Sequence, residues 1–131
     1  MSYTLNKQVR GSFDEVVEQT TEALSDEGFG VLCDIDVQQT LKEKLDEDFR
    51  RYQILGACNP QLAHQALEEE IQLGTLLPCN IIVYETEDNS VGVSAVDPEV
   101  LLSVVDNPEL DQIATDVRNR FGHVLDELPQ A

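Results

Sequence analysis

The chain has 131 residues, of which 41% are hydrophobic and 26% are charged, a length and composition typical of one globular domain. Asp and Glu number 26 against 8 Lys and Arg, which gives a formal net charge of −18. Such an acid excess excludes binding to nucleic acid or to an anionic membrane through a basic surface. Because no apolar run is long enough to span a bilayer and the N-terminus lacks the pattern of a signal peptide, we expect a cytoplasmic protein.

The first half of the chain alternates between strand-like and helix-like segments. Ser12, with Glu15 three residues later, is the pattern of a capping box, so a helix is predicted to begin after Ser12. Gly28 suits the position that follows the last helical turn. The predicted elements here are a strand over residues 3–9, a helix between Ser12 and Gly28, a strand over residues 29–35, a short helix that Asp36 caps, a turn at residues 46–48 and a strand over residues 49–56.

The second half begins with a helix and ends with two. Asn59 and Pro60 suit the N-cap and the first position of a third helix, which we expect Gly74 to end. Two strands joined by a short polar turn then predict an antiparallel hairpin. The remaining predicted elements are strands over residues 80–85 and 91–96, a short helix that starts at Asp97-Pro98, and a last helix that starts at Pro108.

This order of elements, β-α-β-α-β-α-β-β-α-α, is typical of the α+β class. The strict alternation ends at the hairpin, which favours a curved, mixed or antiparallel sheet packed against helices. Because no internal repeat or linker interrupts the pattern, residues 1–131 are predicted to form a single compact domain.

The acidic residues are spread along the whole chain, with apolar residues recurring between them, so we expect them to coat a folded domain. At low salt, so much like charge destabilises the compact state by self-repulsion. Molar salt shortens the Debye length to about 3 Å and removes most of that penalty. The acid-rich, lysine-poor composition resembles that of cytoplasmic proteins from salt-accumulating halophiles. The alternative is an acidic protein with a cationic partner.

Three cysteines, none in a CxxC pair, favour reduced thiols. Cys58 directly precedes the predicted N-cap Asn59, where the helix dipole favours a thiolate, and Cys79 lies at the entry to the fourth strand. If the third and fourth strands are neighbours, both thiols face a common pocket. The alternative is that both are buried and inert, as free cysteines often are. Cys33, in the middle of a predicted strand, is expected in the core.

His64 is a candidate third ligand beside these cysteines. It follows Cys58 by six residues, and with Cys58 and Cys79 it would complete a three-ligand metal site that leaves one position open. The alternative is a surface histidine beside Glu68, four residues further along the helix.

Arg50 and Arg51 are adjacent cations in a chain that has few. In a strand their side chains would point to opposite faces, so one would be available to bind an anionic ligand. Pairing with the many acids is the simpler interpretation. The common nucleotide-binding, hydrolase and metalloprotease motifs do not occur in the sequence, so no catalytic residue and no cofactor are assigned.

Four stretches together resemble the domain-of-unknown-function family 302. They are GFGVL at residues 28–32, LKEKL at residues 41–45, YQILGACNP at residues 52–60 and LLPCN at residues 76–80. The resemblance covers residues 12–128, and its specific part is the pair of segments around Cys58 and Cys79. Asp97-Pro98 after the fifth strand also matches the family.

The resemblance implies a compact α+β domain with a curved sheet, related to the TATA-binding-protein-like fold. It carries over no agreed activity, and the fold name does not carry over DNA binding, because a fold does not imply a function and the charge of −18 opposes it. The positions that match the family motif are Gly56, Cys58, Asn59, Pro60, Leu77, Pro78 and Cys79.

Three functional hypotheses follow. The first is a small binding module, whose pocket takes a small ligand, a thiol compound or a metal. Its expected ligand-binding residues are Cys58, Cys79, Asn59, His64, Arg50 and Arg51. The second is a noncatalytic interaction protein, as a homodimer with structural cysteines. The third is a thiol-dependent enzyme of sulfur transfer or redox chemistry, for which the sequence shows no base positioned to activate Cys58.

Overall fold

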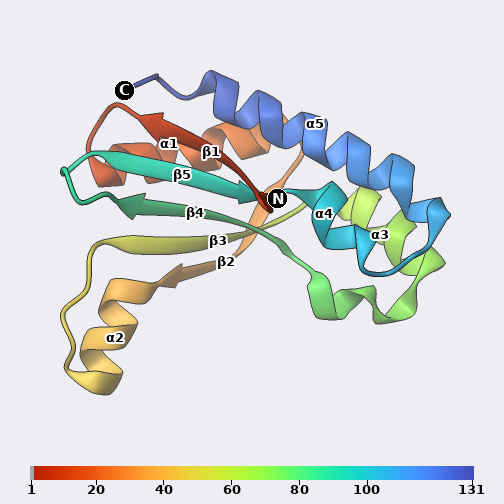
Figure 1. The fold of residues 1–131 in the computed structure, drawn as a ribbon, viewed down its shortest axis with the longest axis horizontal. Coiled ribbons are helices and arrows are strands. Elements are labelled where there is room, and N and C mark those ends of the chain that lie inside the picture. Colours follow the sequence, from red (N-terminus) through yellow and green to blue (C-terminus); the bar gives the residue numbers. More distant parts are fainter. Residues whose placement is uncertain (1) are drawn as a thin grey trace.

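A computed structural model describes residues 2–131 and shows the predicted α+β architecture (Figure 1). Five strands form one sheet, and helices pack on one of its faces. The elements are β1 (Thr4–Val9), α1 (Phe13–Asp26), β2 (Gly30–Asp36), α2 (Val37–Leu45), β3 (Tyr52–Cys58), α3 (Pro60–Glu69), the 3-10 helix η1 (Ile71–Leu76), β4 (Cys79–Glu85), β5 (Val91–Val96), α4 (Pro98–Ser103), the 3-10 helix η2 (Pro108–Leu110) and α5 (Asp111–Glu127).

The strand order across the sheet is β1-β5-β4-β3-β2, and every neighbouring pair is antiparallel. The expected hairpin is β4–β5. Because β3 and β4 are neighbours, the chain segments that carry Cys58 and Cys79 end side by side. In their register Ala57 lies opposite Cys79.

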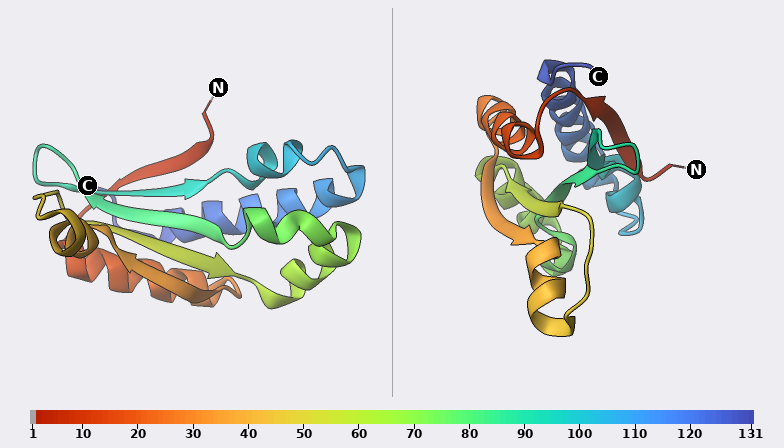
Figure 2. Two further views of the ribbon diagram at one scale, coloured as in Figure 1. Left: turned by 90° about the horizontal axis from the view of Figure 1, so that it is seen from below. Right: turned by 90° about the vertical axis from the view of Figure 1, so that its left-hand side faces the viewer.

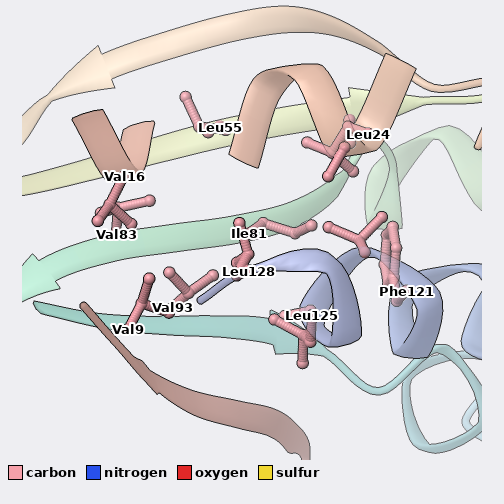
Figure 3. Close-up of a cluster of buried hydrophobic side chains, with 14 of the residues drawn as sticks. Val9, Val16, Leu24, Leu55, Ile81, Val83, Val93, Phe121, Leu125 and Leu128 are labelled. Carbon is pink, nitrogen blue, oxygen red and sulfur yellow. The ribbon is translucent and has the colours of Figure 1, made fainter. Parts of the chain in front are cut away.

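The main core lies between the sheet and two helices. α1 and α5 lie side by side on the same face of the sheet, as the view along the strands shows (Figure 2). Leu24 of α1 and Phe121 of α5 are fully buried against Leu55, Ile81 and other inward side chains of the central strands (Figure 3). Burial of each such large side chain stabilises the fold by about 1.5–3 kcal/mol.

A second, smaller core cluster lies at the end of the sheet where β3 finishes and β4 begins. It joins α3, η1, α4, η2 and α5 through Ala66, Leu73, Leu102, Leu110 and Ala114. The functional candidates therefore lie where the main core meets a layer of short helices.

Four of the predicted helix starts are confirmed by their caps. The side chains of Ser12, Asp36, Asn59 and Asp97 each accept a hydrogen bond from a backbone N–H in the first turn of the following helix. Each cap of this kind stabilises its helix by about 1 kcal/mol.

Three predicted boundaries are wrong. The last helix, α5, begins at Asp111, because Pro108–Leu110 forms the 3-10 helix η2. α3 ends at Glu69, and Gly74 lies inside η1, because the chain tightens into a 3-10 helix that buries Leu73 before any glycine is reached. Arg50 and Arg51 precede β3 instead of lying within it, since the ladder with β4 begins only at Tyr52.

Cys33 is exposed, which contradicts its expected place in the core. β2 is the edge strand of the sheet, and a register shift between Val31 and Cys33 places Cys33 opposite Gly56. There it lies on the face that α1 and α5 do not cover.

α2 projects from the body of the protein, away from α1 and α5 (Figure 2). It has no buried residue. Within residues 2–131, no helix combines the length and the apolar character needed to cross a membrane.

Candidate functional site

A small cavity lies between the ends of β3 and β4 and the short helices beside them. Its volume is about 50 Å³, and its wall is almost wholly apolar. The side chains that line it come from β3, α3, η1, β4, α4, α5 and the loops between elements: Phe29, Ala57, Cys58, Asn59, Leu62, Ala63, Ala66, Leu73, Leu77, Pro78, Cys79, Pro98, Leu102, Ile113 and Val117.

Both junction cysteines line this cavity, as expected for neighbouring strands. Cys79 is buried, with 8% of its surface exposed, whereas Cys58 is half-buried. Both are free thiols. Cys79 therefore belongs to the sealed part of the wall, and Cys58 to the part nearest solvent.

The electrostatics of the cavity oppose a thiolate. Burial raises the pKa of the Cys58 thiol. Burial, and secondly the neighbouring Cys58, raise the pKa of Cys79 from 9.0 to about 11. Burial thus opposes the helix dipole of α3, which favours a thiolate at Cys58, and favours the alternative of an inert thiol. Both thiols carry their protons at neutral pH, and neither is an activated nucleophile.

Asn59 links the cavity wall to the first half of the chain. Its Oδ1 accepts a hydrogen bond from the Leu62 N–H at 3.2 Å and so caps α3. Its Nδ2 lies 2.9 Å from the point where a Cβ of Gly28 would stand, and Gly28 has a φ of +86°. The side chain of Asn59 is thus held as a structural part of the wall, with its amide oxygen already used.

Three of the expected ligand-binding residues lie elsewhere. His64 faces away from the cavity, and its Nε2 lies 3.0 Å from Glu68 Oε1. Arg51 pairs with Asp14 at 2.8 Å and stacks on a phenylalanine ring. Arg50 donates a hydrogen bond to the carbonyl oxygen of Glu85.

The three-ligand metal site is consequently not formed. The position of His64 along α3 directs its side chain to solvent, whereas Cys58 and Cys79 line the cavity on the other side of this helix. Among residues 2–131, no group of three or more His, Cys, Asp or Glu side chains is arranged to hold a metal ion.

A wider open groove, of about 820 Å³, runs between β1 and α5. Its cations are already used: Lys7 Nζ donates to the carbonyl oxygens of Leu125 and Leu128 at 2.8 and 2.7 Å, and Arg118 pairs with Asp97 at 3.2 Å. This groove is a surface depression with paired charges, so the cysteine cavity is the stronger candidate.

Sequence reasoning missed most of the apolar wall. The wall includes residues from segments far apart in the chain, namely Phe29, Leu77, Ile113 and Val117. The sequence marks them only by apolar periodicity, which is equally typical of an ordinary core. The two polar anchors of the prediction, Cys58 and Cys79, were found because a strand and a helix or loop meet at each of them.

Comparison with known proteins gives the family. Residues 5–128 match the family described as "Domain of unknown function DUF302". The chain belongs to this family. Its structure is similar to the crystal structure of an uncharacterised conserved DUF302 protein from Bacillus stearothermophilus, with a TM-score of 0.91 and 32% sequence identity over 98% of this chain and 99% of the other. A search of curated proteins returns no match.

The two DUF302 segments around Cys58 and Cys79 form two sides of the cavity. Residues 55–60 form the end of β3 and the start of α3, and residues 76–80 lead from η1 into β4. Gly56 allows these segments to meet, since a Cβ there would stand 2.8 Å from Pro78 Cγ. The most specific residues of the family resemblance therefore build this place in the fold.

Proposed function

We propose that this DUF302 protein is a small binding module and that the cavity beside Cys58 and Cys79 receives a small apolar group. The observation that supports this is the meeting of both cysteines with an otherwise apolar wall around one void. Ligand pockets share this composition, with apolar walls and few polar groups. A void in an ordinary core lowers the stability of the fold. A void between the family segments around Cys58 and Cys79 therefore favours a binding role.

The volume limits the ligand. Drug-sized ligands occupy pockets of about 300–1,000 Å³, and one water takes a share of about 30 Å³ of the liquid. The 50 Å³ of this cavity therefore suits a molecule of very few heavy atoms, or the apolar end of a longer one whose remainder stays in solvent.

The thiols define the chemistry of contact. A protonated thiol is a polarisable, weakly polar group, so Cys58 and Cys79 would contact an apolar group or the sulfur of a thiol compound without reacting. The raised pKa values support a noncatalytic role over sulfur transfer.

We propose further that the protein works in a cytoplasm of high salt concentration. The support is the net charge of −18 together with three unpaired cysteines.

The test is native mass spectrometry on protein purified in high salt without added reductant or chelator. We expect a bound mass on the wild type, and its loss in Ala63→Leu, which fills the cavity wall from α3. Gln65→Leu adds the same side chain to an exposed position on the same helix and is expected to keep the bound mass.

If no ligand survives purification, xenon and ethanethiol serve as probes. We expect each to raise the melting temperature of the wild type and of Gln65→Leu, but not of Ala63→Leu. Absence of a bound mass, together with absence of stabilisation by both probes, would show that the cavity is a packing defect and that the cysteines are structural.

A further inference from the structure

The face of the sheet opposite α1 and α5 is open, and its side chains carry no charge. One row crosses all five strands through directly paired residues: Ile35, Ile54, Ile82, Ser94 and Asn6. Directly paired residues of antiparallel strands project to the same face. These isoleucines take no part in the core cluster between the sheet and the helices.

The neighbouring row on this face is aromatic. Tyr52 pairs with Tyr84, and Tyr84 lies over Gly92, where a Cβ would stand 2.6 Å from its ring. Phe49 continues the row, with its ring centroid 6.0 Å from that of Tyr52. Three rings thus lie along one end of the open face.

The other end of the open face is also uncharged. Cys33, Gly56 and Asn80 are paired across β2, β3 and β4. Charged residues make up 26% of the chain, yet none of the described residues in these three rows is charged. The acids of the sheet project to the other face or lie in loops.

Apolar exposure is concentrated beside this face. Leu32, Ile35, Leu45 and Phe49 are large, exposed apolar residues on β2, the end of α2 and the loop that follows it. α2 projects from this corner of the sheet (Figure 1). The open face is uncharged, and the projecting helix stands at its edge, where the exposed charges Lys42, Glu43 and Lys44 are of both signs.

We propose that this surface binds a second copy of the chain. A cationic partner would be drawn to the acidic parts of the protein. Burying an unpaired carboxylate at an interface costs free energy even in high salt, so two copies of net charge −18 associate most favourably through a surface that lacks acid. The uncharged face is such a surface. Its isoleucine and tyrosine rows supply the apolar and aromatic groups that are enriched at the centre of homodimer interfaces.

The area of the sheet alone is too small for a stable dimer. Five strands spaced by about 4.8 Å, with six residues each at about 3.3 Å, cover roughly 400 Å² of flat area. A stable dimer buries about 800 Å² on each partner. The sheet supplies about half of that, so the proposed interface includes the exposed apolar residues Leu32, Leu45 and Phe49 at its edge.

The experiment is sedimentation velocity over a range of protein concentrations in molar KCl. We expect a species of twice the chain mass of 14.6 kDa. Ile35→Glu places an acid on the open face, at a residue that is already 46% exposed, and should weaken association at least tenfold. Ile71→Glu is the matched control, because Ile71 lies on η1, outside this face, and is 81% exposed.

A second readout follows Cys33, the exposed thiol of the open face. Its alkylation rate should fall as protein concentration rises through the dimer dissociation constant, and should stay constant in Ile35→Glu. A monomer at every soluble concentration, or a dimer that Ile35→Glu leaves intact, would overturn the proposal. Neither result depends on whether the cysteine cavity binds a ligand.

Discussion

At the scale of single residues, burial governs the chemistry of Cys79. Its thiol pKa is raised to about 11 from 9.0. Below pH 9.0 the thiol is protonated in both the folded and the unfolded chain, so it does not affect stability. Above pH 9.0 the unfolded chain loses the proton and the folded chain keeps it, which favours unfolding. The free energy of unfolding should therefore fall between pH 9.0 and about 11, by up to about 3 kcal/mol from this group.

Urea denaturation of the wild type and of Cys79→Ala across this pH range checks the expectation. Other groups titrate there in both proteins, so the quantity of interest is the difference between the two slopes. The decline should be shallower in Cys79→Ala. Parallel declines would show that the Cys79 thiol ionises as easily in the folded protein as in the unfolded chain.

Gly28 holds the contact between the first half of the chain and the cavity wall. Its φ of +86° disfavours any side chain, and a Cβ would stand 2.9 Å from Asn59 Nδ2. We expect Gly28→Ala to destabilise the fold by about 1–3 kcal/mol in urea denaturation. Gly30→Ala is the control, because nothing lies within 4 Å of a Cβ there. Equal stabilities of the two variants would contradict the account.

At the scale of elements, α2 stands apart from the other helices. It has nine residues and none of them is buried, whereas isolated helices shorter than about 12–15 residues are marginal in water. In dilute protein we expect the amides of α2 to exchange with solvent faster than those of α1 and α5. Hydrogen exchange measured by mass spectrometry tests this, and α2 protection equal to that of α1 in a monomer would contradict it.

Local signals predicted the helix starts well, because a cap depends on a few adjacent residues. Ser12, Asp36 and Asn59 each occupy the predicted N-cap position. Element ends that depend on distant partners were not predictable. The start of β3 is set by pairing of Tyr52 with Tyr84, which no local pattern around Arg50 contains.

The candidate site was predictable to the same extent. Cys58 and Cys79 lie at junctions that a linear pattern reveals, and adjacency of β3 and β4 brings them together. His64 was misplaced because a helix turns about 100° per residue, so a small difference in phase moves a side chain from the inner to the outer side. The apolar wall depends on packing of α3, η1, α4 and α5, which the sequence does not define.

At the scale of the whole molecule, charge sets the conditions for stability. The described ion pairs occupy Lys42, Arg51, Arg118 and Arg120, which leaves most of the 26 acids without a cation. We expect the melting temperature to rise by at least about 5 °C between low salt and molar KCl, since screening removes self-repulsion. A melting temperature that is independent of KCl would contradict the proposed high-salt cytoplasm.

The central claim is that the cavity between β3, β4 and α3 is open to small molecules at Cys58. The most direct test is site-resolved alkylation of the folded, dilute protein with a small neutral reagent, followed by mass spectrometry. The account predicts that Cys33 reacts first, that Cys58 reacts measurably but more slowly, and that Cys79 reacts only after unfolding. If Cys58 stays unreacted until the protein unfolds, the cavity is closed to solvent and the proposed binding role is wrong.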